Sequence, residues 1–418
     1  MKSLHLCAIL SFLLVQVGCS TLSHGAFNVR SFGAVGDGTT KDTAAFQKAL
    51  DACAAANGGT VVVPAGNYLI GSIQVKSYTT LRLEKGAHLM SSPDLDDYPV
   101  IKIRWEGHWV DGHRALIYAR DAGYFSIVGP GKISGNPALS GREMPRRPVI
   151  IEPINCIEVR LEDFATEHKS MWSIHPIYCV NFTAKNLVIR STGGNGDGID
   201  VDSCKNVRIE SCDIDTGDDC IALKSGRGLE GYRLARPTEN VLISHCTLGD
   251  NIFACIGIGS ETSGGIRNIK IEHCKFTHVK TFAVYIKSNP GRGAFIEDVA
   301  GHDLEVNTVP GGFLRFNLSG SGIKDAEPVP GLEGIPATKN FSFKDVKVNC
   351  GTLVDADHTS PEKPVNGLLL EDIRGTCQKG ITLANMTNVV LRDIHVAGFT
   401  GPFLTQTNVS GIGLEDLK

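Results

Sequence analysis

A short pattern of polar and apolar positions recurs along most of the chain. Each copy starts with a polar residue, often Asn, and continues as an alternating strand, as in Asn206-Val207-Arg208-Ile209. Copies begin at Glu158, Asn181, Asn206, Asn240, Asn268, Asn340, Asn388 and Gly411. The first two steps between copies are 23 and 25 residues, and later steps lengthen where loops intervene. Short alternating strands repeated every ~20–50 residues are typical of a stacked solenoid.

The segments between these strands indicate which kind of solenoid to expect. They show no helical period, which favours a parallel β-helix over a leucine-rich repeat, and the period is too short for a propeller blade of ~40–45 residues. Residues 40–56 differ, because they are rich in Ala with near-helical apolar spacing and end at Asn57-Gly58-Gly59. We therefore expect an all-β, right-handed parallel β-helix, forming one domain over residues 26–418, with an N-terminal helix that caps its core.

Four consecutive coils are expected to gather acidic side chains on one face. Because side chains alternate along a strand, one row points inward: Ile199, Ile221, Ile256 and Val284. Three rows point outward: Asp197, Asp219, Ala254 and Phe282; Asp200, Ala222, Gly257 and Tyr285; and Asp202, Lys224, Gly259 and Lys287. Asp218 precedes Asp219 at the strand edge. The stacking thus places five carboxylates on one face, with neighbouring strands only ~4.8 Å apart.

Carboxylates this close together cannot all ionise freely, so the pKa of at least one of them should rise. A raised pKa keeps a general acid protonated beside ionised partners, and glycoside hydrolysis requires such a pair of an acid and a base. A structural Ca²⁺ site and an acidic face turned to solvent fit the same spacing, so the pattern alone leaves these three interpretations open. Asp202 next to Lys224 is expected to form a structural ion pair.

The start of the chain predicts export. Met1-Lys2 is followed by an apolar run from Leu4 to Val17 and by the small residues Gly18-Cys19-Ser20, which is typical of a secretory signal over residues 1–25. We expect a secreted, extracellular protein. In a bacterial host, Cys19 is also consistent with a periplasmic or lipid-anchored protein.

Several of the thirteen cysteines recur at equivalent points of the repeat and form two ladders, one of Cys156, Cys179 and Cys204 and one of Cys212, Cys246 and Cys274. No CxxC pair occurs, so their spacing is not that of a zinc site. Most are expected to be buried thiols, while export permits disulfides, for which Cys204 with Cys220 and Cys350 with Cys377 are candidates. A net charge of −4 gives no electrostatic reason to expect nucleic acid as a partner. No segment after the signal is long and apolar enough to predict a membrane span, and we expect a monomer.

Five ordered motifs resemble those of glycoside hydrolase family 28, the polygalacturonases and their relatives. The opening Phe27-Asn28-Val29 through Gly33-Ala34-Val35-Gly36-Asp37-Gly38 resembles the start of the family. The other four are Met171-Trp172-Ser173-Ile174-His175-Pro176 for WxxHP, Asn195-Gly196-Asp197-Gly198-Ile199-Asp200 for NTDGID, Gly217-Asp218-Asp219-Cys220 for GDDC, and Ile258-Gly259-Ser260-Glu261 for IGSE. The resemblance covers nearly the whole expected domain.

The resemblance implies a hydrolase that cleaves galacturonic acid linkages in pectic chains with inversion, without a metal or an organic cofactor. By that similarity Asp218 is the general acid, and Asp197 and Asp219 hold and deprotonate the attacking water. Lys287, from the RIK element of the family, and His175 are expected to contact the substrate.

Two positions depart from the family pattern. The GHG element is Phe253-Ala254-Cys255 here, so that Ala254 replaces its His, and Tyr285 replaces the Arg of the RIK element. That Arg is a bidentate carboxylate clamp that Tyr cannot replace, although Tyr285 offers a flat face to a sugar ring and Arg292 could act as a second cation.

These departures favour a linkage with galacturonate on only one side, as in rhamnogalacturonan, or removal of a terminal galacturonate. Cleavage of ordinary polygalacturonan is the next interpretation in order. The alternatives are a Ca²⁺-dependent enzyme like the pectate lyases and a catalytically silent glycan-binding solenoid.

Overall fold

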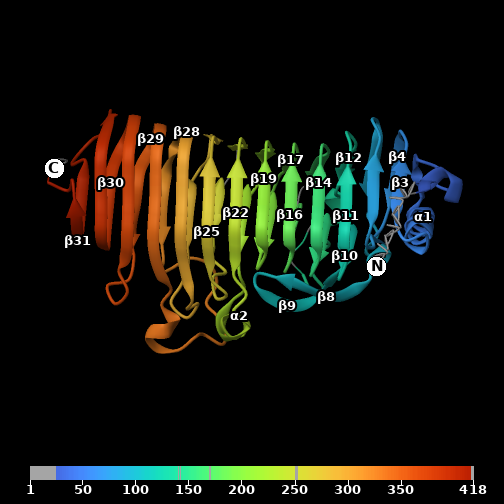
Figure 1. Cartoon of the computed structure of the whole chain (residues 1–418), viewed down its shortest axis with the longest axis horizontal. Helices are drawn as coiled ribbons and strands as arrows, with labels where there is room; N and C mark the ends of the chain where they lie inside the picture. Colours follow the sequence, from blue (N-terminus) through green and yellow to red (C-terminus); the bar gives the residue numbers. More distant parts are fainter. Residues whose placement is uncertain (1–24, 140, 142, 169–170, 250–252, 416–418) are drawn as a thin grey trace, which may run out of the picture.

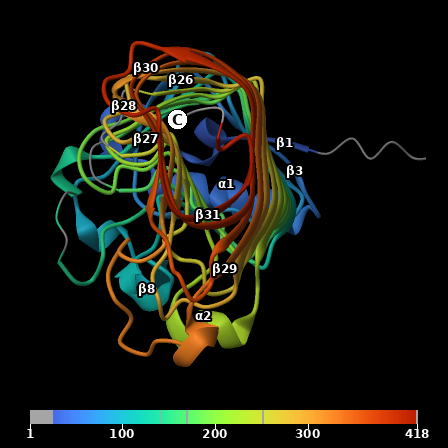
Figure 2. The same cartoon turned by 90° about the vertical axis from the view of Figure 1, so that its left-hand side faces the viewer.

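The computed structural model describes residues 25–139, 141, 143–168, 171–249 and 253–415. Almost all strands in these residues are parallel and stack along one long axis, from helix α1 (Thr43–Ala55) at one end to β31 (Leu404–Ile412) at the other (Figure 1). Seen along that axis the coils superimpose (Figure 2). The expected parallel β-helix is confirmed.

The strands form three parallel ladders, each built from one strand per coil. The first ladder contains β1 (Gly25–Asn28), β3 (Gly59–Val63), β6 (Thr79–Leu83), β11 (Gly123–Val128), β14 (Ile157–Glu162), β16 (Val180–Lys185), β19 (Lys205–Glu210), β22 (Thr238–Ser244) and β25 (Ile266–Glu272). The second contains β2 (Asp37–Lys41), β4 (Gly66–Ile70), β7 (Ala87–Ser91), β12 (Lys132–Ser134), β15 (Ala165–His168), β17 (Val188–Ser191), β20 (Asp213–Asp215), β23 (Thr247–Gly249) and β26 (Lys275–Thr277). The third contains β5 (Ile73–Gln74), β10 (Ile117–Arg120), β13 (Ile151–Ile154), β18 (Ile199–Asp202), β21 (Ile221–Lys224), β24 (Ile256–Ile258) and β27 (Phe282–Lys287).

The last coils and two insertions complete the architecture. Three long strands, β28 (Phe295–Asn317), β29 (Ala337–His358) and β30 (Val365–Ala397), bend through the ladders without a break. The antiparallel hairpin of β8 (Val100–Trp105) and β9 (His108–His113) and the short helix α2 (Gly228–Leu234) project from the same side of the stack (Figures 1 and 2). Within the described residues, 3-10 turns lie at Val29–Phe32, Leu95–Asp97, Pro137–Leu139 and Gly331–Gly334.

The recurring Asn has a conformational role at the corner where β16, β19, β22 and β25 begin. Asn181, Asn206, Asn240 and Asn268 all have φ between 54° and 58°, in the left-handed region that Asn tolerates better than most residues. Their side chains also bond from coil to coil, because the amide of Asn206 donates to Asn181 and that of Asn240 donates to Asn206, each at 2.9 Å. The polar position of the repeat therefore sets both the corner and the alignment of the coils.

Helix α1 caps the core at the N-terminal end, as expected. Its buried face, which includes Phe46 and Leu50, packs into the continuous apolar core of the stack. The Phe46 ring lies 5.3 Å from the Tyr68 ring in an edge-on arrangement. The helix starts later than the expected residue 40, because residues Asp37–Lys41 form strand β2 and pair with β4.

The cysteine ladders are confirmed, but the two candidate disulfides are wrong. The eleven cysteines within the described residues are all buried thiols. Cys204 and Cys220 lie in different coils, where their Sγ atoms contact the Pro176 and Ile214 carbonyls, respectively. Cys350 and Cys377 are register neighbours on β29 and β30, yet they pack in the core without a bond.

The expected signal segment lies outside the described residues up to residue 24. Gly25, its last expected residue, already pairs with Gly59 at the start of β1. Within the described ranges, no helix combines the length and the apolar character needed to cross a membrane.

Candidate active site

The third ladder carries the acidic face in the register expected from the sequence. Ile221 pairs with Ile199 in the coil before it and with Ile256 in the coil after it, and Ile256 pairs with Val284. These four side chains are fully buried, so the alternate positions face outward. The register brings Asp197, Asp218 and Asp219 together at the amino ends of β18 and β21.

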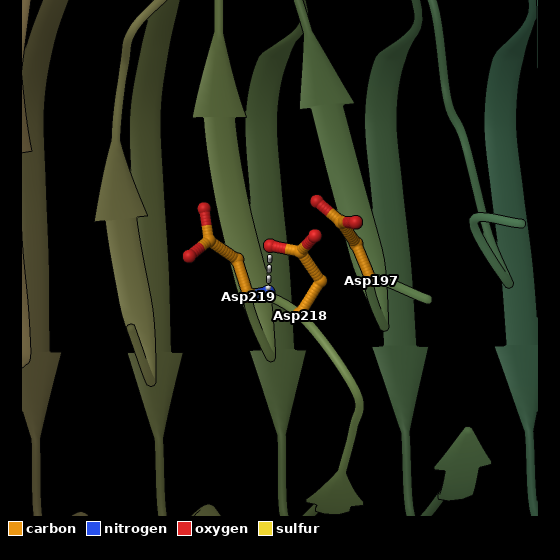
Figure 3. A group of neighbouring side chains, drawn as sticks. All are labelled: Asp197, Asp218 and Asp219. Atoms are coloured by element: carbon orange, nitrogen blue, oxygen red, sulfur yellow. Dashed lines mark hydrogen bonds between the residues drawn. The ribbon is translucent and has the colours of Figure 1, made fainter. Parts of the chain in front are cut away.

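These three residues form a carboxylate group (Figure 3). One oxygen from each lies within 4.8 Å of the others. Two backbone N–H groups hold Asp218: that of Asn195 donates to Oδ2 at 3.0 Å and that of Asp219 donates to Oδ1 at 3.1 Å. The same spacing could hold one cation, so the geometry alone does not separate an acid–base group from an ion site.

Asp219 is held between a backbone donor and a lysine. Its Oδ1 accepts a hydrogen bond from the Ala254 N–H at 3.0 Å, and its Oδ2 accepts one from Lys287 Nζ at 2.5 Å. Lys287 comes from two coils away and reaches across Gly257, where an added Cβ would lie only 2.4 Å from Asp219 Oδ2. The missing side chain at residue 257 therefore permits this ion pair.

Burial and like charges raise the pKa of two carboxyls in the group. Burial is the largest cause for Asp197, followed by the charges of Asp200 and Asp218, and its pKa lies well above the usual range. The pKa of Asp218 is raised by burial and then by Asp219. A carboxyl that favours its protonated form in this way is suited to donate a proton near neutral pH.

The ion pair expected between Asp202 and Lys224 is wrong. Lys224 Nζ lies 2.5 Å from Asp200 and 3.8 Å from Asp197. Asp202 instead accepts a bond of 2.8 Å from Arg104 Nε. Arg104 belongs to the β8–β9 hairpin, which reaches Asp202 from outside the ladder. Lys224 is then left to turn toward the carboxylates nearer the amino ends of the strands.

The carboxylate group opens into a cleft of about 240 Å³. Besides the three aspartates, the cleft is lined by Glu106, Trp172, Arg227, Phe253, Tyr285 and Lys287, among others. A wider groove of about 630 Å³ runs over the first ladder, along β14 to β25, and shares none of these residues.

The cleft is closed at the end that faces the N-terminus, where the β8–β9 hairpin covers the outer face of the third ladder. Trp105 stacks on Trp172 with ring centroids 4.9 Å apart. Both belong to a buried cluster with Tyr118 and Val149 from the preceding coils. Glu106, at the hairpin turn, lies 3.2 Å from Arg227 Nη1. The outer face of these earlier coils is therefore inaccessible, whereas the side chain of Arg315, one coil beyond Tyr285, is 26% exposed.

Of the four expected substrate contacts, Lys287 and Tyr285 line the cleft and His175 and Arg292 do not. His175 is 1% exposed, with its Nδ1 3.2 Å from Glu152 Oε1 and its ring edge-on against Trp172. Arg292 is fully buried, and its Nε lies 2.6 Å from Asp325. Both expectations are corrected, because neither side chain has surface to offer a ligand.

The sequence analysis missed Glu106 and Arg227. Glu106-Gly107 joins two alternating runs, and both residues have positive φ, 43° and 80°. A two-residue turn between alternating runs is a hairpin signal that could have revealed the insertion. Arg227 has no comparable local signal, because its role depends on Glu106 and Asp325, which lie 121 and 98 residues away.

Comparison with known proteins decides the family. The chain matches the glycosyl hydrolases family 28 over residues 53–314. It belongs to this family. A "Probable polygalacturonase" of Vitis vinifera is 30% identical over 371 residues, which cover 85% of this chain and 74% of that protein. An "Exo-poly-alpha-D-galacturonosidase" of Dickeya chrysanthemi is 26% identical over 408 residues, which cover 83% of this chain and 65% of that protein.

Solved structures give the same fold. The family 28 exopolygalacturonase of Yersinia enterocolitica superimposes with a TM-score of 0.77 at 20% identity, covering 92% of this chain and 77% of that chain. An exopolygalacturonase of Thermotoga maritima gives 0.68 at 25% identity, covering 92% and 91%. The protein is therefore a family 28 glycoside hydrolase of the polygalacturonase type with a parallel β-helix fold, and its family implies a pectic substrate.

Proposed function

We propose that this family 28 hydrolase removes the terminal galacturonate from a pectic chain. The observation that carries the proposal is the closed end of the cleft. Because the β8–β9 hairpin buries the outer face of the coils before Asp197, a polymer cannot lie across the carboxylate group in both directions. A chain end that enters and stops at Glu106 and Trp172 fits this shape.

In this proposal Asp218 protonates the leaving oxygen, as the family resemblance implies, and burial and Asp219 raise its pKa in the direction that a proton donor requires. Asp197 and Asp219 hold the attacking water. Lys287, which is paired with Asp219 and lines the cleft, lies where it can also meet a uronate carboxylate. The carboxylate oxygens lie closer together than the ~6.5–9.5 Å usual for inverting enzymes. Inversion therefore rests on the family resemblance, and the spacing does not support it.

Two comparisons favour action at the chain end. The Dickeya chrysanthemi relative is named an exo-poly-alpha-D-galacturonosidase, and both structures cited above are exopolygalacturonases. The carboxylate group, the cleft that is closed at one end and these relatives together support chain-end action more strongly than any one of them alone.

A digestion time course tests the proposal. With polygalacturonan and rhamnogalacturonan oligomers as parallel substrates, we expect one small product of constant size from the first minutes and a slow fall in polymer viscosity. Reducing-end-labelled oligomers of defined length show which end is attacked. An early ladder of intermediate oligomers with a rapid fall in viscosity would contradict chain-end action. The Asp218→Asn variant, which we expect to be almost inactive, is prepared in parallel and controls for contaminating hydrolases.

Membership in a hydrolase family also predicts how the reaction responds to chelators. We expect the rate to be unchanged by EDTA and no rise in ultraviolet absorbance, because hydrolysis leaves no unsaturated product. The measurement is reducing-end release and absorbance in one assay, with and without EDTA and added Ca²⁺. A Ca²⁺-dependent rate with rising absorbance would move the assignment to a lyase, and release of no sugar at all would favour a glycan-binding role.

We further propose that the protein is secreted through the signal over residues 1–25. A pectic polymer is an extracellular substrate, which is consistent with export. Cell fractionation of the full-length chain, compared with a chain lacking residues 1–25, would test this.

A further inference from the structure

On the side away from the β8–β9 hairpin the cleft is bounded by Tyr285, and a guanidinium packs against Tyr285 and its buried neighbour Phe282. Tyr285 lines the cleft, and Arg315 of β28 pairs with it in the following coil. Arg315 Cζ lies 5.2 Å from the Tyr285 ring centroid and 5.5 Å from that of Phe282. Contact with two rings both positions the cation and removes part of its hydration.

This guanidinium keeps donors for a ligand. Its Nε lies 3.4 Å from Asp355 Oδ2, and the side chain is 26% exposed. Because a guanidinium carries five N–H donors in a planar fork, one contact with Asp355 leaves the Nη groups able to meet a carboxylate bidentately. Tyr285 is itself held, since its Oη accepts a hydrogen bond from Asn317 at 3.3 Å.

Three cations that line the cleft are bound more closely to carboxylates of the protein. Lys287 lies 2.5 Å from Asp219, Lys224 lies 2.5 Å from Asp200, and Arg227 lies 2.9 Å from Asp325. Arg315 has a longer contact, of 3.4 Å, and a side chain that is 26% exposed, so it can change partner at a smaller cost.

We propose that Arg315 binds the carboxylate of the sugar on the side of the scissile bond that lies away from the β8–β9 hairpin. This inference rests on the proposed chain-end action, because a substrate stopped by the hairpin must continue past Tyr285 toward Arg315. The family pattern has a cationic Arg at the position of Tyr285. Because neighbouring coils lie ~4.8 Å apart, Arg315 supplies a cation one coil further along the ladder. The substrate is then a chain with galacturonate on both sides of the cut, which reverses the preference expected from Tyr285 in the sequence.

The test compares Arg315→Met with the wild type and with Lys270→Met, a control that removes an exposed cation from the first ladder. One substrate is an oligogalacturonide with free carboxylates, and the other is methyl-esterified at every residue except the terminal one. We expect Arg315→Met to lower kcat/KM on the free acid by roughly 10- to 100-fold and to leave the ester unchanged. Arg315→Lys should recover part of the loss. Lys270→Met should match the wild type on both substrates.

Two results would overturn the inference. One is an equal loss, or no loss, on both substrates in Arg315→Met, since a structural role or no role would not depend on the neighbouring carboxylate. The other is a wild type that cleaves galacturonate–rhamnose linkages in preference to the free oligogalacturonide. The size of the first product in the same digests tests chain-end action separately, because it does not depend on the ratio of kcat/KM between the two substrates.

Discussion

Replacing Asp218 by Asn is expected to lower kcat by roughly 10²–10⁴-fold while the protein stays folded. Asn keeps the shape of the side chain and can still accept the hydrogen bond from the Asn195 N–H, but it cannot deliver a proton to the leaving oxygen. The measurement is the release of reducing ends from an oligogalacturonide at saturating substrate. Retention of more than about a tenth of the wild-type rate would remove Asp218 from the role of general acid, given the usual size of that contribution.

The same variant carries a stability signature that an inactive, misfolded protein would not show. Burial and Asp219 raise the folded-state pKa of Asp218. Ionisation of this carboxyl therefore destabilises the folded protein at pH values above the ordinary pKa and has no effect at pH values below it. Asn does not ionise, so the free energy of unfolding of the variant should increase relative to that of the wild type as the pH rises from about 4 to 7. Asp96→Asn, at an exposed and distant aspartate, is the matched control and should show no such trend.

Replacing Arg104 by Ala is expected to destabilise the fold by about 3–5 kcal/mol, the usual cost of removing one partner of a buried ion pair. Arg104 and Asp202 have side chains only 1% and 2% exposed, and the variant leaves the Asp202 carboxylate buried without its cation. Burial is the largest influence on the pKa of Asp202 and raises it, but Arg104, His175 and the Ser203 hydroxyl together outweigh burial, so the pKa is lowered. The loss should therefore be largest at neutral pH and shrink as acid protonates Asp202. Urea denaturation at pH 7 and at about pH 4 measures both values.

Lys102→Ala is the control on the same hairpin. Lys102 and Asp111 form an exposed pair at 2.8 Å, for which a contribution of less than about 1 kcal/mol is usual. If Arg104→Ala lowered the free energy of unfolding by no more than this control does, the buried ion pair would not be the contact that holds the hairpin against the third ladder. The double variant Arg104→Ala with Asp202→Ala should recover part of the loss, because it removes the uncompensated charge.

The acidic cluster shows which side-chain positions the local sequence pattern can predict. Alternation within β18, β21, β24 and β27 is a property of each strand, and stacking at a fixed period aligns the strands, so the placement of Asp197 beside Asp219 could be predicted from the sequence. The partner of Lys224 could not, because a long side chain turns toward whichever carboxylate the surrounding packing leaves open.

The sequence by itself determined the coil repeat, the capping helix, the register of the third ladder and the identity of the three clustered aspartates. Each of these follows from interactions within a strand or between neighbouring coils, which the period of the sequence encodes. Only the tertiary structure decided that the cleft is closed at one end, that His175 and Arg292 are buried, and that Arg315 stands beside Tyr285. Those features depend on inserted segments and distant coils that meet in space: Glu106 and Arg227 are 121 residues apart in the chain, and no local preference connects residues at that separation.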